Sequence, residues 1–145
     1  MIHQRAELLT PAQVQEYWPV LKPWYDASCE SCEVTRDLMV GDDILKMAKE
    51  NRCHVFGFFG DGVLRFTMAI QFADANGHKV AYIIGMGGKN MRAFLANYWP
   101  YIQDWMRENG ATAVYTEAGD RNARIYMKKY GFDKSTVKLG KSLGG

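Results

Sequence analysis

Residues Lys79 to Phe132 read KVAYIIGMGGKN, MRAFLANYWPYIQDWMRENG and ATAVYTEAGDRNARIYMKKYGF, and this stretch decides the fold. Its first part, residues 80–84, is wholly apolar or aromatic, which is typical of a short strand buried on both faces. Glycines at 85, 87 and 88 then interrupt the run. Because glycine favours turns and close approach by another group, we expect a loop here.

The second part of the stretch predicts a helix, a strand and a short helix. Apolar residues recur at spacings of three and four from Met91 to Met106, which indicates an amphipathic helix ending at Gly110. Residues 112–117 are rich in β-branched and aromatic side chains and predict a strand. Asp120 can cap a last helix that Gly131 ends. Strand, helix and strand of this length form a right-handed crossover, so the two strands should be parallel.

The glycine loop is the candidate anion site. Backbone N–H groups at the start of a helix have no partner within the helix and carry partial positive charge. A glycine-rich entry would let a pyrophosphate reach them, and Lys89 and Arg92 add two positive charges. The alternative is that residues 85–88 form only a tight connection, since a lone glycine cluster is a weak signal.

The sequence before this stretch predicts further strands and helices. Thr10, Pro11 and Gln13 form a capping box with proline at the first helical position. Pro19 and Pro23 predict that this helix is kinked or short. The expected elements are a strand over 2–7, a helix from 11, a loop over 26–40, a helix from 41 or 42 to 51, and strands over 53–59 and 63–72.

Three antiparallel strands are thus expected before the crossover. Gly60-Asp61-Gly62 is typical of a hairpin turn. Alternation from residue 64 to residue 72 places Leu64, Phe66, Met68, Ile70 and Phe72 on one face of their strand. Residues 135–139 alternate weakly and predict a closing strand, with a frayed end over 141–145. The whole chain, 1–145, reads as a single domain.

Composition limits the class of protein. The chain has 145 residues, 48% hydrophobic, with a net charge of +2, so a globular domain is expected rather than a nucleic-acid binder. The first ten residues hold no apolar run, and no segment approaches the roughly 20 apolar residues of a membrane span, so we predict neither a signal peptide nor membrane insertion. Three cysteines fit a reducing, cytoplasmic setting. Cys29 and Cys32 form one CxxC with no second pair, so no metal is predicted.

The order of elements resembles the GNAT acyltransferase superfamily. The resemblance covers nearly the whole chain, and it is sharpest from Lys79 through the long helix and over Arg121 to Phe132, where an Asn near a helix start and a following Gly-Phe match the family's closing helix. The resemblance implies an α/β (α+β) fold. It has a mixed sheet, an antiparallel meander followed by a parallel β-α-β crossover, and helices on both faces. More narrowly, the chain resembles divergent GNAT-like proteins of tailed phages.

This resemblance implies acetyl-CoA as acyl donor and an amine, on a small molecule or a protein, as acceptor. In the family a bulge splays the two parallel strands, and here it would fall near Ile84 and Gly85. One of their N–H groups would bind the thioester carbonyl. Asn122 would contact the pantetheine arm. The pyrophosphate would bind the amides of Met86, Gly87, Gly88, Lys89 and Asn90, with Arg92 nearby.

The catalytic side chains depart from the family pattern. The family often has a proton-donating tyrosine four residues before the Gly of Gly-Phe, and Met127 stands there. Tyr126 and Tyr130 are the candidate donors, although each should point about 100° or more away from that position. Glu117, at a strand end, is the candidate general base. Its alternative is a solvated carboxylate.

Two functions therefore stay open. One is an N-acyltransferase, expected in the cytoplasm, of the host if the chain is phage-encoded. The other is a catalytically inactive GNAT-like phage protein that acts in the virion, in morphogenesis or on a host partner. The glycine loop fits the family's usual pattern only with Tyr82 in the place of an Arg or Gln. This departure and Met127 favour the second function, whereas Lys89 and Arg92 favour the first. A homodimer or a phage or host protein partner fits either reading, because fold alone does not decide function.

Overall fold

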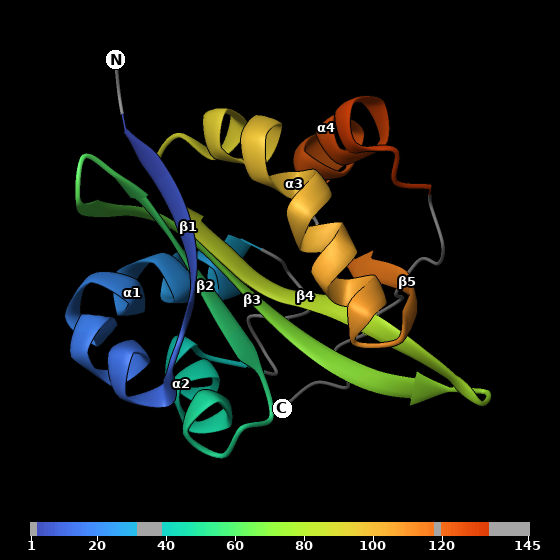
Figure 1. Cartoon of the computed structure of the whole chain (residues 1–145), viewed down its shortest axis with the longest axis horizontal. Coiled ribbons are helices and arrows are strands. Elements are labelled where there is room, and N and C mark those ends of the chain that lie inside the picture. The colour runs from blue at the N-terminus through green and yellow to red at the C-terminus, as the bar shows by residue number, and fades with distance from the viewer. Residues whose placement is uncertain (1–2, 32–38, 118–119, 134–145) are drawn as a thin grey trace, which may run out of the picture.

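A computed structural model describes residues 3–31, 39–117 and 120–133, and the expected closing strand over 135–139 and frayed end over 141–145 lie outside these ranges. The elements, in chain order, are β1 (Gln4–Leu9), α1 (Pro11–Ser31), α2 (Gly41–Lys49), β2 (His54–Gly60), β3 (Val63–Ala75), β4 (His78–Gly88), α3 (Met91–Glu108), β5 (Ala111–Thr116) and α4 (Asp120–Tyr130) (Figure 1).

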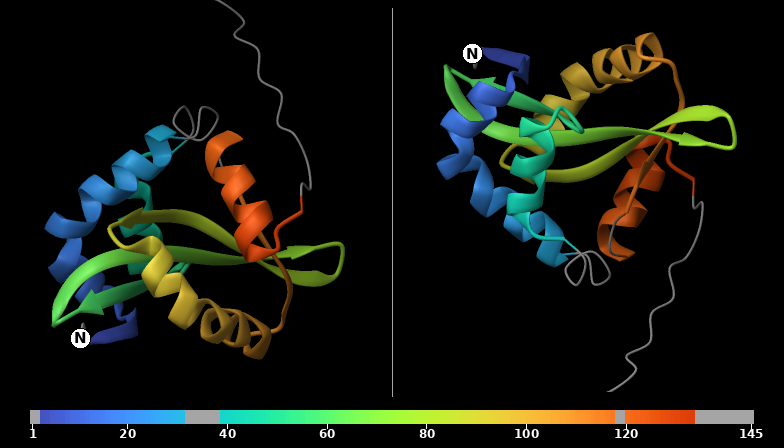
Figure 2. Two further views of the ribbon diagram at one scale, coloured as in Figure 1. Left: turned by 90° about the horizontal axis from the view of Figure 1, so that it is seen from above. Right: turned by 90° about the horizontal axis from the view of Figure 1, so that it is seen from below.

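The sheet is mixed, with the order β1-β2-β3-β4-β5. The first four strands pair antiparallel, and β4 pairs parallel with β5 through the crossover helix α3. Helices α1 and α2 cover one face and α3 covers the other (Figure 2). The predicted mixed sheet, parallel crossover and helices on both faces are therefore confirmed.

Helix α1 is longer than the sequence pattern predicts. It runs unbroken for 21 residues through Pro19 and Pro23, so the loop expected from residue 26 is wrong for residues 26–31. Each interior proline costs about 3 kcal/mol, so the two together cost about 6 kcal/mol. The core face of α1 buries five side chains, and each contributes about 1.5–3 kcal/mol, which outweighs that cost. They are Val14, Trp18, Leu21, Tyr25 and Cys29.

The start of α1 has the expected capping box. The Gln13 amide donates to Thr10 Oγ1 at 3.2 Å, and the Thr10 amide donates to Gln13 Oε1 at 2.8 Å. Two orphan amide donors are satisfied in this way. The box fixes where α1 begins and therefore which of its faces meets the sheet.

A buried hydrogen-bond chain anchors α1 to the sheet. Tyr25 Oη lies 2.7 Å from Thr67 Oγ1, and the Thr67 hydroxyl donates to the Phe56 carbonyl at 2.8 Å. Because Thr67 has one proton to give, Tyr25 donates to Thr67. Trp18 stacks on Tyr25 with ring centroids 6.0 Å apart. The aromatic cluster of α1 is therefore core.

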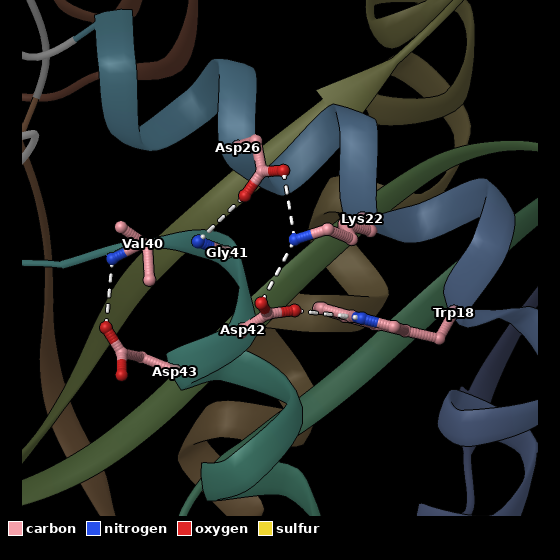
Figure 3. Close-up of polar contacts among 7 residues, drawn as sticks. All are labelled: Trp18, Lys22, Asp26, Val40, Gly41, Asp42 and Asp43. Atoms are coloured by element: carbon pink, nitrogen blue, oxygen red, sulfur yellow. Dashed lines mark hydrogen bonds and ion pairs between the residues drawn. The ribbon is translucent and has the colours of Figure 1, made fainter.

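A polar network joins α1 to the start of α2 (Figure 3). Lys22 Nζ lies 3.3 Å from Asp26 Oδ2 and 3.1 Å from Asp42 Oδ2. Asp42 also accepts from Trp18 Nε1 at 3.3 Å, and Asp26 accepts from the Gly41 amide at 3.0 Å. The hydrogen bond from Lys22, and then that from Trp18, lowers the pKa of Asp42. These exposed ion pairs contribute little stability, although they connect the second half of α1 to the first turn of α2.

The two hairpins of the sheet have tight turns. Asp61 and Gly62 have φ of 51° and 80°, and Asn76 and Gly77 have the same values, which suits two-residue turns with positive φ. The turn predicted at residues 60–62 is confirmed.

The prediction that Leu64 shares a face of β3 with Phe66 is wrong. Between the pairs Phe58–Phe66 and Phe59–Leu64, β3 carries one extra residue, a β-bulge at Arg65. A bulge reverses the alternation of side chains. Leu64 therefore packs with the α1–α2 cluster, whereas Phe66 packs beneath α3.

Candidate functional site

The parallel strands separate next to a bulge in β4. Ala69 pairs with Gly85 and Ile70 pairs with Ile83, so Ile84 is the extra residue of β4. The bulge expected near Ile84 and Gly85 is confirmed. Pairing between β4 and β5 ends at Ile83 and Thr116, whereas β4 continues to Gly88. Beyond Ile83, β4 stays paired with β3 but no longer pairs with β5, which leaves an opening between the two parallel strands.

An apolar pocket lies at this opening. Its walls come from β3, β4, β5, α3 and α4 and from the residue that follows Gly131. They are Met68, Ile83, Met86, Leu95, Trp99, Thr116, Tyr126, Tyr130 and Phe132. Three ring pairs join its aromatic side, with centroids 5.9–6.2 Å apart: Trp99–Phe132, Tyr126–Phe132 and Tyr126–Tyr130.

The two candidate tyrosines lie on this pocket together. Tyr126 and Tyr130 are one helical turn apart on α4, and both line it. Met127 is exposed, so the face of α4 toward the pocket is the tyrosine face. Burial, with a smaller contribution from Tyr130, raises the pKa of Tyr126. The Tyr126 hydroxyl is therefore protonated near neutral pH and can donate a proton.

The predicted glycine loop is a strand. Residues 85–88 belong to β4 and pair with β3, so the loop expected there is wrong and only Lys89 and Asn90 connect β4 to α3. A Cβ on Gly85 would lie 2.8 Å from the Tyr25 ring, and one on Gly87 would lie 2.7 Å from Trp24 Cβ. The space that these two glycines leave is filled by α1.

Gly88 is also required by the fold. Its φ is 115°, and a Cβ there would collide with the Arg65 carbonyl oxygen. Positive φ and this close approach both exclude larger side chains. A substitution at Gly88 would therefore disturb the pairing of β3 and β4 before it reported on a ligand.

Two of the amides expected to bind pyrophosphate already have partners. The Met86 amide donates to Ser28 Oγ at 3.2 Å, and the Lys89 amide donates to the Arg65 carbonyl at 2.7 Å. Asn90, with φ of 62°, precedes α3 and makes no side-chain capping bond. Lys89 and Arg92 are exposed beside the first turn of α3. The anion-binding features of this region are thus those of a helix start.

The remaining candidates, Glu117 and Asn122, both follow β5 in the chain. Glu117 directly follows β5 and is exposed. Asn122 is the third residue of α4. Sequence reasoning did not assign Trp99 to the site. Its place on the apolar face of α3 was a signal for core, and the pocket forms only after α4 packs beside it.

Other chemistry-bearing residues belong to the core or the surface. Cys29 is buried, and Cys32 of the CxxC lies outside the described ranges. His54 packs edge-on against the rings of Phe72 and Trp105. Among the described residues no group of three or more His, Cys, Asp or Glu side chains could hold a metal ion. None of the described helices has the length and apolarity to cross a membrane.

Known structures share this fold along nearly the whole chain. A scan of family models and a search of curated proteins both find no match. An aminoglycoside acetyltransferase from an uncultured soil metagenomic sample superposes with a TM-score of 0.70 at 11% identity, covering 98% of this chain and 99% of its own. A predicted acetyltransferase from Clostridium acetobutylicum, solved with acetyl-CoA, gives 0.68 at 14% identity and 97% of both chains. Ribosomal-protein-alanine N-acetyltransferase from Brucella melitensis gives 0.64 at 11% identity, covering 95% and 100%.

The chain therefore has the fold of the GNAT N-acetyltransferases. At 11–14% identity the likeness concerns the fold alone.

Proposed function

We propose that the chain is an N-acyltransferase that moves an acetyl group from acetyl-CoA to an amine. The observation that carries this proposal is the bulge at Ile84, after which β4 and β5 separate beside an apolar, aromatic pocket. A narrow apolar opening suits the methylene-rich pantetheine arm. The Clostridium acetobutylicum neighbour, which holds acetyl-CoA, supports the same choice of donor.

The residues around the opening fit the parts of this donor. Lys89 and Arg92, beside the first turn of α3, would hold the pyrophosphate by charge and by helix amides. The amide of Ile84 or Gly85, at the bulge, would donate to the thioester carbonyl. Asn122 would contact the arm from α4. Amides from Gly87, Gly88 and Asn90 would complete the phosphate contacts.

The chemistry requires two proton transfers. The amine nitrogen forms a bond to the thioester carbon, and the C–S bond breaks to release CoA thiolate. We assign proton donation to this thiolate to Tyr126 or Tyr130, because both line the pocket and Tyr126 stays protonated. Glu117, at the end of β5, would accept the proton from the substrate ammonium. Holding amine and thioester together supplies much of the remaining rate.

The acceptor is proposed only as an amine of a small molecule or a protein. Helix α1 and the start of α2, joined by the Lys22 network, form the wall opposite α3 and would shape the acceptor side. The structural neighbours range from an aminoglycoside acetyltransferase to a ribosomal-protein-alanine N-acetyltransferase, so they do not choose among acceptors. A cytoplasmic location and a phage source are part of the same proposal.

Calorimetric titration with acetyl-CoA tests the proposal directly. We expect micromolar binding, followed by release of free CoA thiol when a panel of amines, aminoglycosides and peptide N-termini is added. The control is the same titration with adenosine diphosphate, which lacks the arm and should bind more weakly. No heat of binding at millimolar acetyl-CoA would refute the proposal.

The second candidate is a GNAT-shaped interaction protein without catalysis, of the phage or host-binding kind. The engaged amides of Met86 and Lys89 favour it, because two of the expected cofactor contacts are already used within the chain. Under this reading the fold would act as a scaffold for a protein partner or a second copy. Failure to bind acetyl-CoA would leave this candidate standing.

A further inference from the structure

One residue of the pocket wall carries a buried hydrogen-bond donor that has no acceptor among the described residues. The indole N–H of Trp99 is buried, and no described residue accepts a hydrogen bond from it. Trp99 is 8% exposed and lines the pocket between the separated strands. Trp18, in contrast, donates its indole N–H to Asp42 at 3.3 Å. Buried donors are nearly always paired, so the Trp99 N–H needs an explanation.

Packing alone does not explain this donor. The neighbours of Trp99 in the wall include Leu95 on the same helix and Phe132, whose ring centroid lies 5.9 Å away. A phenylalanine would present an aromatic ring to this surface without a polar atom. Because an unpaired buried N–H opposes folding, a bound acceptor would remove a cost that the described residues leave in place.

The rest of the wall restricts what that acceptor can be. Met68, Ile83 and Met86 are apolar, and the Thr116 hydroxyl donates to the Ile83 carbonyl at 3.4 Å. Among the described residues no Lys or Arg lines the pocket, so none of them offers a countercharge to an anionic group there. The wall therefore suits a neutral oxygen flanked by methylene groups.

We propose that the Trp99 indole N–H donates a hydrogen bond to a carbonyl oxygen of the acyl-pantetheine arm. This inference rests on the proposed function, because it assumes that the arm enters the opening beside Ile84. It makes Trp99 a ligand-binding residue, in addition to the bulge amides and the start of α3. Binding of the arm then satisfies a buried donor that the described residues leave unpaired.

The variant Trp99→Phe tests the contact, since it keeps an aromatic ring and removes the donor. We expect about three- to tenfold weaker binding of acetyl-CoA by calorimetry, which corresponds to the loss of one net hydrogen bond. The melting temperature of the free variant should equal or exceed that of the wild type. Trp105→Phe is the matched control, because Trp105 lies on α3 but packs against Phe56. It should bind acetyl-CoA like the wild type.

The free thiol CoA, which lacks the thioester carbonyl, identifies the oxygen. Weakening of acetyl-CoA alone would assign the bond to the thioester carbonyl, and equal weakening of both ligands would assign it to an amide carbonyl of the arm. Both results support the contact.

Two other outcomes overturn it. The first is wild-type affinity for acetyl-CoA in Trp99→Phe. The second is a free variant as destabilised as Trp18→Phe, which would show that the chain itself supplies the acceptor. A wild type that does not bind acetyl-CoA refutes the proposed function and this inference together.

Discussion

Replacing Gly87 by alanine should destabilise the protein by pushing α1 away from β4. A Cβ at this position would lie 2.7 Å from Trp24 Cβ and 2.8 Å from the Trp24 carbonyl oxygen, whereas ordinary contacts begin at 3.4 Å. Because both are atoms at the helix backbone, no side-chain rotation relieves them, and α1 must move by about 0.7 Å. Overpacking of this kind costs about 1–3 kcal/mol. With a urea m-value of about 2 kcal/mol/M, the unfolding midpoint should fall by about 0.5–1.5 M.

Gly57→Ala is the matched control for this experiment. Gly57 also lies in a strand, but a Cβ there would meet the Leu64 and Leu9 side-chain ends at 3.1 and 3.3 Å and the edge of the Phe59 ring at 3.1 Å. These side chains can shift, so we expect a loss below about 1 kcal/mol. Urea unfolding followed by far-UV circular dichroism measures both variants. A Gly87→Ala protein with wild-type stability that no longer binds acetyl-CoA would refute the packing argument and show that the glycine is needed for the ligand instead.

Three further predictions address the site and the core. Lys89→Ala should raise the Kd for acetyl-CoA severalfold at low salt and much less at 0.5 M NaCl, because salt screens the exposed charge of Lys89. Acetyl-pantetheine lacks the diphosphate, so calorimetry should give the same Kd for it with the variant and with the wild type. Tyr126→Phe should lower the kcat of acetyl transfer by about 100-fold or more with little change in KM if Tyr126 is the proton donor; an unchanged kcat would move that role to Tyr130. Burial, and then the charge of Lys79, lowers the pKa of His54 from 6.5, so the unfolded chain binds the proton more readily and stability should fall as the pH drops from about 7.5 to 5.5. Urea unfolding of His54→Gln over this range should lose that slope, and a persisting slope would assign the effect to another group.

The elements best predicted from sequence were those with strong local signals. The apolar face from Met91 to Met106 gave α3 to within a residue or two, and Asp61-Gly62 placed the first hairpin. The parallel pairing of β4 and β5 followed from the length of the crossover. These features depend on residues that are close together in the sequence, so a local sequence pattern predicts them.

The features that the sequence did not predict correctly all depend on tertiary packing. Helix α1 passes Pro19 and Pro23 because its other face docks on the sheet, and that docking has no local signature. Gly85 and Gly87 have the same sequence appearance whether a phosphate or a helix approaches them. Tyr126 and Tyr130 were identified from the sequence, but their meeting with Trp99 depends on how α4 packs.

The strand order also bears on how the chain acquires its structure during synthesis. β2, β3 and β4 are joined by two-residue turns, so residues 54–88 can pair as soon as they emerge from the ribosome, through contacts of short sequence separation. β1 is made first, yet its partner ends at Gly60, so the N-terminal strand has to wait while about fifty residues are added. During that interval α1 has no sheet to cover its apolar face. The nascent chain is therefore most exposed to misassociation before the first hairpin closes.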